Sequence, residues 1–211
     1  PAGPSSAASP PCGAARARAP CSTTAPEPSA PVRTFVAAWP DAATRRRLAA
    51  LELGHHKNLR LVGPTRWHVT LRFLGEVSGE QVALLGPALL AGVAEQPGPL
   101  DCRLGPATAW FSRVRVLQLP AHGLDELAAV VTRATAHIVP ERDGGGPPFN
   151  GHLTLARVKG RLGPQAQSEL AGIPFDSAFG VEHVDLVASA PSPGGHVYST
   201  LVRAPLGGGL T

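Results

Sequence analysis

Two four-residue motifs carry the side chains of this sequence that are best suited to chemistry. His68-Val69-Thr70-Leu71 and His152-Leu153-Thr154-Leu155 repeat the same order of residue types in the two halves of the chain. The pKa of a histidine ordinarily lies near neutrality, so one of a pair can accept a proton while the other donates one. The neighbouring threonine hydroxyls can donate hydrogen bonds to phosphate oxygens as charge builds there. The pair of motifs therefore predicts displacement at a phosphorus atom by acid–base catalysis.

Two other interpretations of the histidines have to be weighed. A single histidine in a strand is usually structural, and one motif alone would favour that interpretation. Paired histidines also bind metal ions, but no Asp, Glu or Cys stands at ligand spacing beside either motif. Because the repetition is hard to explain structurally, we expect catalysis that uses no metal and no cofactor.

Both motifs fall in segments typical of β-strands. Runs of β-branched and other apolar residues predict strands over 32–39, 67–74, 100–108, 114–119, 149–158, 181–188 and 196–204. Apolar residues at helical spacing or start and stop signals predict helices over 41–53, 79–94, 124–138 and 163–171. Strands and helices are intermixed, and two strands follow each other directly twice. This order indicates an α+β fold with mostly antiparallel sheets.

The alternation of side chains along a strand places each motif histidine on the same face as its threonine. The aliphatic residues of the motif then face the core. Arg72 has the parity of His68 and Thr70, so we expect it on the histidine face. The alternation places Arg157 on the face opposite His152. It reaches the histidine face only if a bulge or the strand end redirects it.

The composition divides the chain into a tail and one domain. Residues 1–31 are rich in Pro, Ala, Ser and Thr and hold no large apolar residue, so we expect them to be disordered. Residues 32–211 suffice for a single domain of two lobes. Apolar runs are too short for a membrane span, and the net charge of +4 tolerates an anionic partner. Cys102 stands alone in the domain, which fits a reducing compartment, and we expect a cytoplasmic monomer.

Taken together, several segments resemble the 2H phosphoesterase superfamily, and within it the RNA 2′,3′-cyclic phosphodiesterases, historically called 2′-5′ RNA ligases. The resemblance spans residues 32–206 and includes both H-x-T-x motifs. The segments that carry it are Arg33–Ala37 (RTFVA), Leu71–Val77 (LRFLGEV), His152–Arg157 (HLTLAR) and Gly195–Tyr198 (GHVY). Either motif alone would be unspecific, whereas the combination is specific.

The resemblance implies a bilobal fold in which two antiparallel sheets face each other across a central cleft, with helices outside. It implies hydrolysis of the 2′,3′-cyclic phosphate at an RNA end, or on a small cyclic nucleotide, to a 2′-phosphomonoester. His68 is then the proton donor and His152 the proton acceptor, while Thr70 and Thr154 hold the phosphate. The two motifs are too alike for the sequence itself to order donor and acceptor.

Further side chains are candidates for substrate binding. Arg157 offers a guanidinium whose geometry suits phosphate, and Arg72 is a second candidate that lines the cleft or is merely solvated. Phe73 and Tyr198 are candidates for stacking on a base, as aromatic side chains do with single-stranded RNA, and core packing is an equal alternative for Phe73.

Two alternatives to the hydrolase stay open. One is an enzyme that performs 2′-5′ ligation or cleaves another cyclic nucleotide. The other is a non-catalytic RNA- or nucleotide-binding module that uses the same cleft. A pure binding module has no need of two proton-transfer groups, which speaks against it.

Overall fold

The computed structural model describes Gly3 and residues 30–141, 148–193 and 195–207. The strands are β1 (Val32–Ala38), β2 (Leu59–Leu61), β3 (Val69–Val77), β4 (Leu100–Leu104), β5 (Ala109–Phe111), β6 (Val116–His122), β7 (His152–Val158), β8 (Ser177–Val181), β9 (His183–Ser192) and β10 (Gly195–Pro205). The helices are α1 (Ala42–Ala49), α2 (Gly79–Val93), α3 (Asp125–Thr135) and α4 (Pro164–Leu170), with a short 3-10 helix at Pro64–Arg66.

The predicted disordered tail lies outside the described residues apart from Gly3, Ala30 and Pro31. The division at residue 31 therefore stays a prediction. Within the described ranges no helix is long and apolar enough to cross a membrane.

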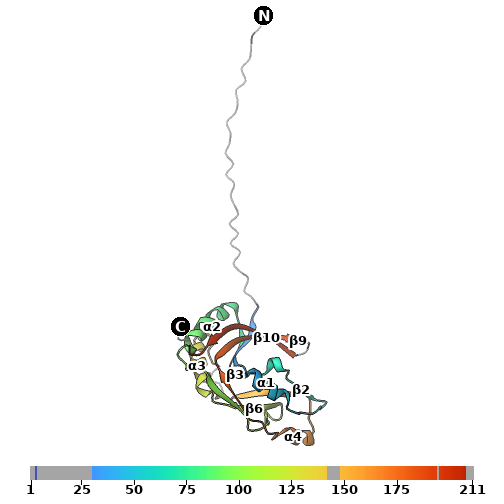
Figure 1. Cartoon of the computed structure of the whole chain (residues 1–211). Coiled ribbons are helices and arrows are strands. Elements are labelled where there is room, and N and C mark those ends of the chain that lie inside the picture. The colour runs from blue at the N-terminus through green and yellow to red at the C-terminus, as the bar shows by residue number, and fades with distance from the viewer. Residues whose placement is uncertain (1–2, 4–29, 142–147, 194, 208–211) are drawn as a thin grey trace.

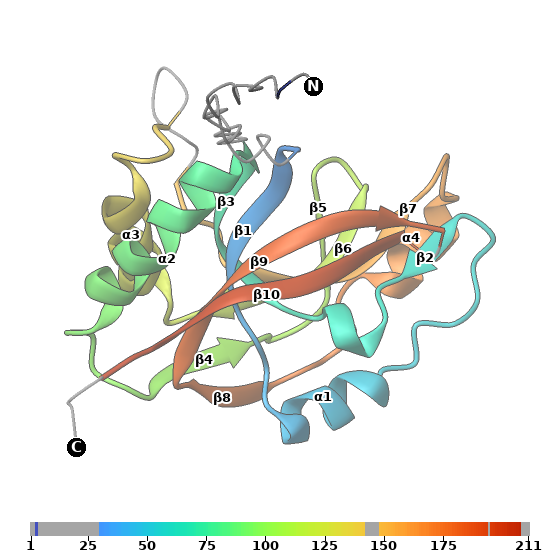
Figure 2. The same ribbon diagram turned by 90° about the horizontal axis from the view of Figure 1, so that it is seen from above.

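The strands form one antiparallel ten-stranded sheet, whose two halves meet at a seam between β3 and β7. Their order is β10-β9-β1-β3-β7-β6-β4-β8, with β2 added to β7 and β5 added to β6. The central strands β3 and β7 are paired through Val69 and Leu153, and each belongs to a different half of the path. Helices α2 and α3 pack together at one end of the molecule, and α4 lies at the other (Figure 1, Figure 2). The predicted α+β class with antiparallel strands is confirmed, and the two predicted sheets are the two halves of one continuous sheet.

The helices begin where the sequence provides caps. The Asp41 carboxylate accepts a hydrogen bond of 2.6 Å from the backbone N–H of Thr44 in the first turn of α1. Ser78 and Gln81 exchange hydrogen bonds of 3.0 and 3.2 Å in a capping box at the start of α2. Further along α2, a Cβ added at Gly92 would collide with the Cβ of Ala134 in α3. The small residue at position 92 is therefore what lets the two helices approach.

The core lies behind the two motif strands. Val69 and Leu153 are 0% exposed, and the fourth residue of each motif, Leu71 or Leu155, is also buried. Cys102 belongs to the same core, and burial raises the pKa of its thiol to about 12. Its behaviour is that of a small apolar side chain.

Each motif strand contains a β-bulge at the last residue of its motif. In β3, Thr70 pairs with Ala37 and Arg72 pairs with Val36, so Leu71 is the extra residue. In β7, Thr154 pairs with Gln118 and the next pair is Ala156 with Leu117, so Leu155 is the extra residue. A bulge interrupts the alternation of side chains along its strand. Both motif strands therefore change parity immediately after the motif.

Candidate active site

The seam between the two halves of the sheet brings the motifs together. His68 directly precedes β3, and His152 is the first residue of β7. The antiparallel pair Val69–Leu153, continued by one residue on each side, sets His68 opposite Thr154 and Thr70 opposite His152. All four side chains are half-buried on one sheet face, which we call the motif face.

The bulges decide which residues follow the motifs onto this face. Beyond Leu71 the exposed side chain is Phe73, 64% exposed, whose ring lies 6.2 Å from that of Phe35. Beyond Leu155 the exposed side chain is Arg157, whose charge acts on His68. The bulge thus redirects Arg157 onto the motif face, as its candidate role requires. Phe73 and Arg157 occupy equivalent positions, each the third residue after the threonine of its motif.

The expectation that Arg72 shares the face of His68 and Thr70 is wrong. Its guanidinium donates to the hydroxyl of Thr135, the last residue of α3, and over 2.6 Å to the carbonyl of Val139 beyond that helix. The side chain is only 8% exposed. The physical reason is the bulge at Leu71, which reverses the alternation on which the expectation rested. Arg72 ties β3 to α3 instead of lining the motif face.

Both imidazoles are held in the same way. The Nδ1 atom of His68 lies 2.7 Å from the carbonyl oxygen of Arg66, and that of His152 lies 2.8 Å from the carbonyl oxygen of Asn150. A carbonyl oxygen only accepts hydrogen bonds, so each Nδ1 must carry a proton and donate it. The proton-exchanging atom of each ring is consequently Nε2. The two histidines therefore present the same nitrogen for chemistry.

Each imidazole also stacks on a phenylalanine. The rings of His68 and Phe35 are 4.9 Å apart, those of His152 and Phe111 are 5.2 Å apart, and both pairs have an interplanar angle of 27°. These contacts fix the planes of the imidazoles, while the carbonyl hydrogen bonds fix their rotation. The seam thus joins two half-sites, each made of one motif histidine, the carbonyl that accepts from its Nδ1 and the phenylalanine on which it stacks.

The surroundings of the two histidines differ in one respect. His68 is additionally enclosed by Trp39 and Tyr198, whose ring centres each lie 5.3 Å from its own. Burial lowers the pKa of His68 to about 4, against the opposing effect of the hydrogen bond to Arg66. The positive charge of Arg157 lowers it further, as a proton on His152 does. In the unliganded protein His68 is therefore neutral at pH 7.

Tyr198 reaches the motif face from β10, but its ring packs edge-on against Phe35 and His68. Trp39, Phe35 and Phe111 complete the aromatic surroundings, and none of the three was among the sequence-derived candidates. Phe111 comes from β5, a three-residue strand too short for its pattern to be recognised. Phe35 lies in β1 and Trp39 directly after it. In this apolar segment the sequence does not distinguish side chains of the motif face from core residues.

Gln118 is a further polar residue that the sequence did not single out. It lies in β6 between Ala109 and Thr154, and paired residues of antiparallel strands share a face. The side chain is 6% exposed, and its Oε1 is buried without a hydrogen-bond partner. A buried carboxamide beside Thr154 was not predictable because Gln118 stands in an apolar strand without a motif.

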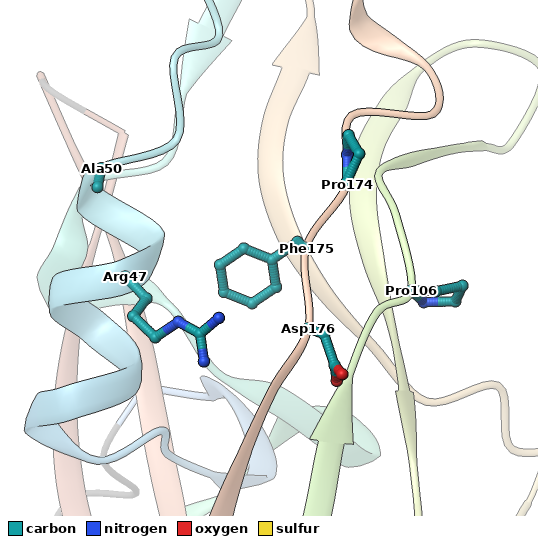
Figure 3. Close-up of a pocket in the computed structure, with 6 residues that line it drawn as sticks. All are labelled: Arg47, Ala50, Pro106, Pro174, Phe175 and Asp176. Atoms are coloured by element: carbon teal, nitrogen blue, oxygen red, sulfur yellow. The ribbon is translucent and has the colours of Figure 1, made fainter.

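Two cavities lie outside the motif residues themselves. One, of about 440 Å³, lies between α1 and the segment that enters β8, lined by Arg47, Ala50, Pro106, Pro174, Phe175 and Asp176 (Figure 3). None of the motif residues lines it. The other, of about 600 Å³, borders the His68 half-site through Trp39 and Tyr198. In the part of the chain that the structure describes, no three His, Cys, Asp or Glu side chains gather as a metal site requires.

Comparisons with known proteins agree with the fold. The RNA 2′,3′-cyclic phosphodiesterase of Escherichia coli (strain K12) is 35% identical over 154 residues, which cover 68% of this chain and 78% of the relative. No protein-family model matches the chain.

Solved structures give the same result. The structure of TT0787 from Thermus thermophilus matches with a TM-score of 0.70 and 28% identity, covering 83% of this chain and 98% of that one. Escherichia coli LigT in its apo form matches with a TM-score of 0.65 and 30% identity, covering 84% and 99%. The sequence identity, the shared fold and the paired H-x-T-x motifs on one face agree, and the chain belongs to the RNA 2′,3′-cyclic phosphodiesterase family of 2H phosphoesterases.

Proposed function

We propose that this protein hydrolyses the 2′,3′-cyclic phosphate at the end of an RNA strand to a 2′-phosphomonoester, without a metal ion. The observation that carries the proposal is the pair of imidazoles on one face, each with Nδ1 bound to a carbonyl and a threonine opposite it. The name of the Escherichia coli relative and the structures of LigT with 3′-AMP and with phosphate support it.

In the proposed reaction His152 is the proton acceptor and His68 the proton donor. His152 Nε2 takes a proton from water while the water oxygen forms a bond to phosphorus. The bond from phosphorus to the 3′ oxygen breaks, and that oxygen receives a proton from His68 Nε2. One proton therefore leaves water and one enters the leaving group. A later exchange of protons with solvent restores both imidazoles.

The donor must be protonated when the substrate is bound, although the free protein holds His68 neutral. The substrate supplies the missing charge, because a phosphodiester anion beside an imidazole favours the imidazolium form and raises its pKa. We therefore expect His68 to take up its proton as the cyclic phosphate binds.

The remaining candidates fit roles around the phosphate. The hydroxyls of Thr70 and Thr154 lie on either side of the seam and can donate to the non-bridging oxygens. Arg157 supplies a fixed positive charge on the motif face. Phe73, largely exposed on the same face, offers a flat apolar surface to the ribose or base.

The test is hydrolysis of an oligoribonucleotide that ends in a 2′,3′-cyclic phosphate, measured in the presence of EDTA. We expect turnover by the wild type and its loss in His68→Ala/His152→Ala. Full activity in that double variant would refute the proposal. A parallel panel of 2′-5′-linked and 3′,5′-cyclic substrates separates hydrolysis of RNA ends from the related activities, and binding without turnover would indicate a binding module.

The order of donor and acceptor has its own test. A diester with a 4-nitrophenolate leaving group needs no proton at the leaving oxygen, whereas the cyclic phosphate does. His68→Ala should therefore lose much less activity on the nitrophenyl diester than on the cyclic phosphate, and His152→Ala should lose activity on both. The reverse pattern would exchange the two roles.

A further inference from the structure

The cavity beside the His68 half-site continues the motif face. Its volume is about 600 Å³, within the usual range for small-molecule sites. Trp39 and Tyr198 form its boundary with the half-site, because both line the cavity and both contact the His68 ring. The rest of the lining comes from the start of α1, from Thr65 and Pro99, from the β8–β9 hairpin, and from Thr200 and Arg203 in β10.

Two arginines of this cavity are held in fixed orientations. Arg203 donates from Nε and Nη2 to the two oxygens of Asp185, over 3.0 and 3.1 Å. The Asp185 side chain is 1% exposed, whereas that of Arg203 is 61% exposed. Arg45 donates from Nε to the carbonyl of Pro40 over 2.9 Å. Each guanidinium is thus oriented by one edge, and its outer edge remains available for an anion.

The carboxylates that line the cavity do not neutralise the outer edges of the two guanidinium groups. Asp185 is paired with Arg203 and also accepts a hydrogen bond of 3.3 Å from Thr200. Asp41 caps α1. Glu182 lies exposed, where water screens its charge. The cavity therefore combines two oriented cations with the aromatic wall of Trp39 and Tyr198, which is how proteins bind single-stranded nucleic acid.

The strand register gives the distance from the motif. Arg203 pairs with Asp185, Asp185 with Ala37, and Ala37 with Thr70. Three strand-to-strand steps separate β10 from β3, about 14 Å at the usual spacing. Arg203 is thus too far away to share the phosphate held at Thr70, and it is placed for a different part of the same strand.

We propose that this cavity binds the nucleotide that precedes the terminal one in a single-stranded RNA substrate. Arg45 and Arg203 contact its backbone phosphate, and Trp39 or Tyr198 contacts its sugar or base. This inference rests on the proposed function, in which His68 protonates the 3′ oxygen. The ribose then lies on the His68 side of the seam, and the strand continues from that ribose toward the cavity.

The experiment compares a tetraribonucleotide with a mononucleoside, both ending in a 2′,3′-cyclic phosphate. We expect the wild type to have the higher kcat/KM on the tetranucleotide. Arg45→Gln should lower kcat/KM on the tetranucleotide about tenfold, the effect of one lost charge-assisted hydrogen bond. It should leave kcat/KM on the mononucleoside within about twofold of the wild-type value. The slope of log kcat/KM against log salt should also become shallower by about 0.7 on the tetranucleotide alone.

Arg203 is tested together with its partner, because removing Arg203 alone would leave a buried carboxylate unpaired. Asp185→Asn/Arg203→Gln keeps the shape of the pair and should show the same selective loss. Arg133→Gln, which removes one exposed positive charge from α3, is the matched control and should change neither substrate.

The outcomes separate the inference from the proposed function. A wild type with no preference for the tetranucleotide, or variants that lose equally on both substrates, would overturn the cavity proposal. A wild type that hydrolyses neither substrate would refute the proposed function. In that case the inference is decided by binding. The variants should lose affinity for a fluorescent tetranucleotide 2′-phosphate and keep their affinity for a nucleoside 2′-phosphate.

Discussion

The burial of His68 should make the free energy of unfolding depend on pH, and the size of this effect follows from the pKa of His68. Its pKa falls from 6.5 to about 4 in the folded protein, chiefly because burial disfavours the charged ring. This difference corresponds to about 3 kcal/mol between the protonated and the neutral states. The folded chain therefore binds fewer protons than the unfolded chain between pH 4 and pH 6.5. Its stability must fall as the pH drops through that window.

The perturbation that isolates this effect is His68→Gln, which removes the titrating group and keeps a side chain able to donate to the Arg66 carbonyl. We expect the free energy of unfolding of the wild type, relative to the variant, to decrease by about 3 kcal/mol from pH 7 to pH 4. Urea unfolding at a series of pH values measures it. The other titrating groups are common to both proteins and cancel in the difference.

A second measurement tests the physical cause directly. NMR titration should give His68 a pKa of about 4 in the wild type. Trp39→Ala admits water to one side of the ring and should move that value toward the ordinary one. Parallel stability curves for wild type and His68→Gln between pH 4 and pH 6.5, or an ordinary His68 pKa by NMR, would refute the argument.

Four other substitutions, two of them at one helix contact, test separate parts of the structure. Thr154→Val should lower kcat/KM on the cyclic phosphate about 100-fold with unchanged thermal unfolding, and activity near that of the wild type would exclude a phosphate contact. Gln118→Leu should raise the free energy of unfolding by about 1 kcal/mol, since it removes a buried oxygen without a partner; a loss of stability would indicate a bond that forms in solution. Gly92→Val should lower the free energy of unfolding by about 1–3 kcal/mol in urea unfolding, and Ala134→Gly should restore part of it. Additive effects of those two changes would contradict the contact between α2 and α3.

The sequence predicted the structure correctly where the structure depends on residues close together in the chain. The helical spacing and the start and stop signals predicted a helix over 79–94, where α2 spans Gly79–Val93. The alternation of side chains predicted which residues of each motif face the core. The motifs themselves depend on nothing beyond one strand each, so their faces could be read directly.

The errors arise where the alternation is interrupted or the strand is very short. The bulge at Leu71 sends Arg72 to α3, and the bulge at Leu155 brings Arg157 to the motif face. A bulge is a property of two paired strands, so the sequence of one strand does not show it. The short strands β2 and β5 obtain their pairing from β7 and β6, and Phe111 was missed together with β5.

The equivalence of Phe73 and Arg157 bears on the direction in which an RNA end can be read. Backbone pairing, bulges, imidazoles and hydroxyls are nearly the same in both half-sites, so these parts by themselves would admit a cyclic phosphate in either of two opposite orientations. At the first position where a side chain returns to the motif face, one half-site carries an apolar ring and the other a cation. A strand end is likewise unequal, with a ribose and base on one side of its phosphorus and only water on the other. Together with the enclosure of His68 by Trp39 and Tyr198, this difference makes the two half-sites unequal, and under the proposed function it favours one orientation of the strand end.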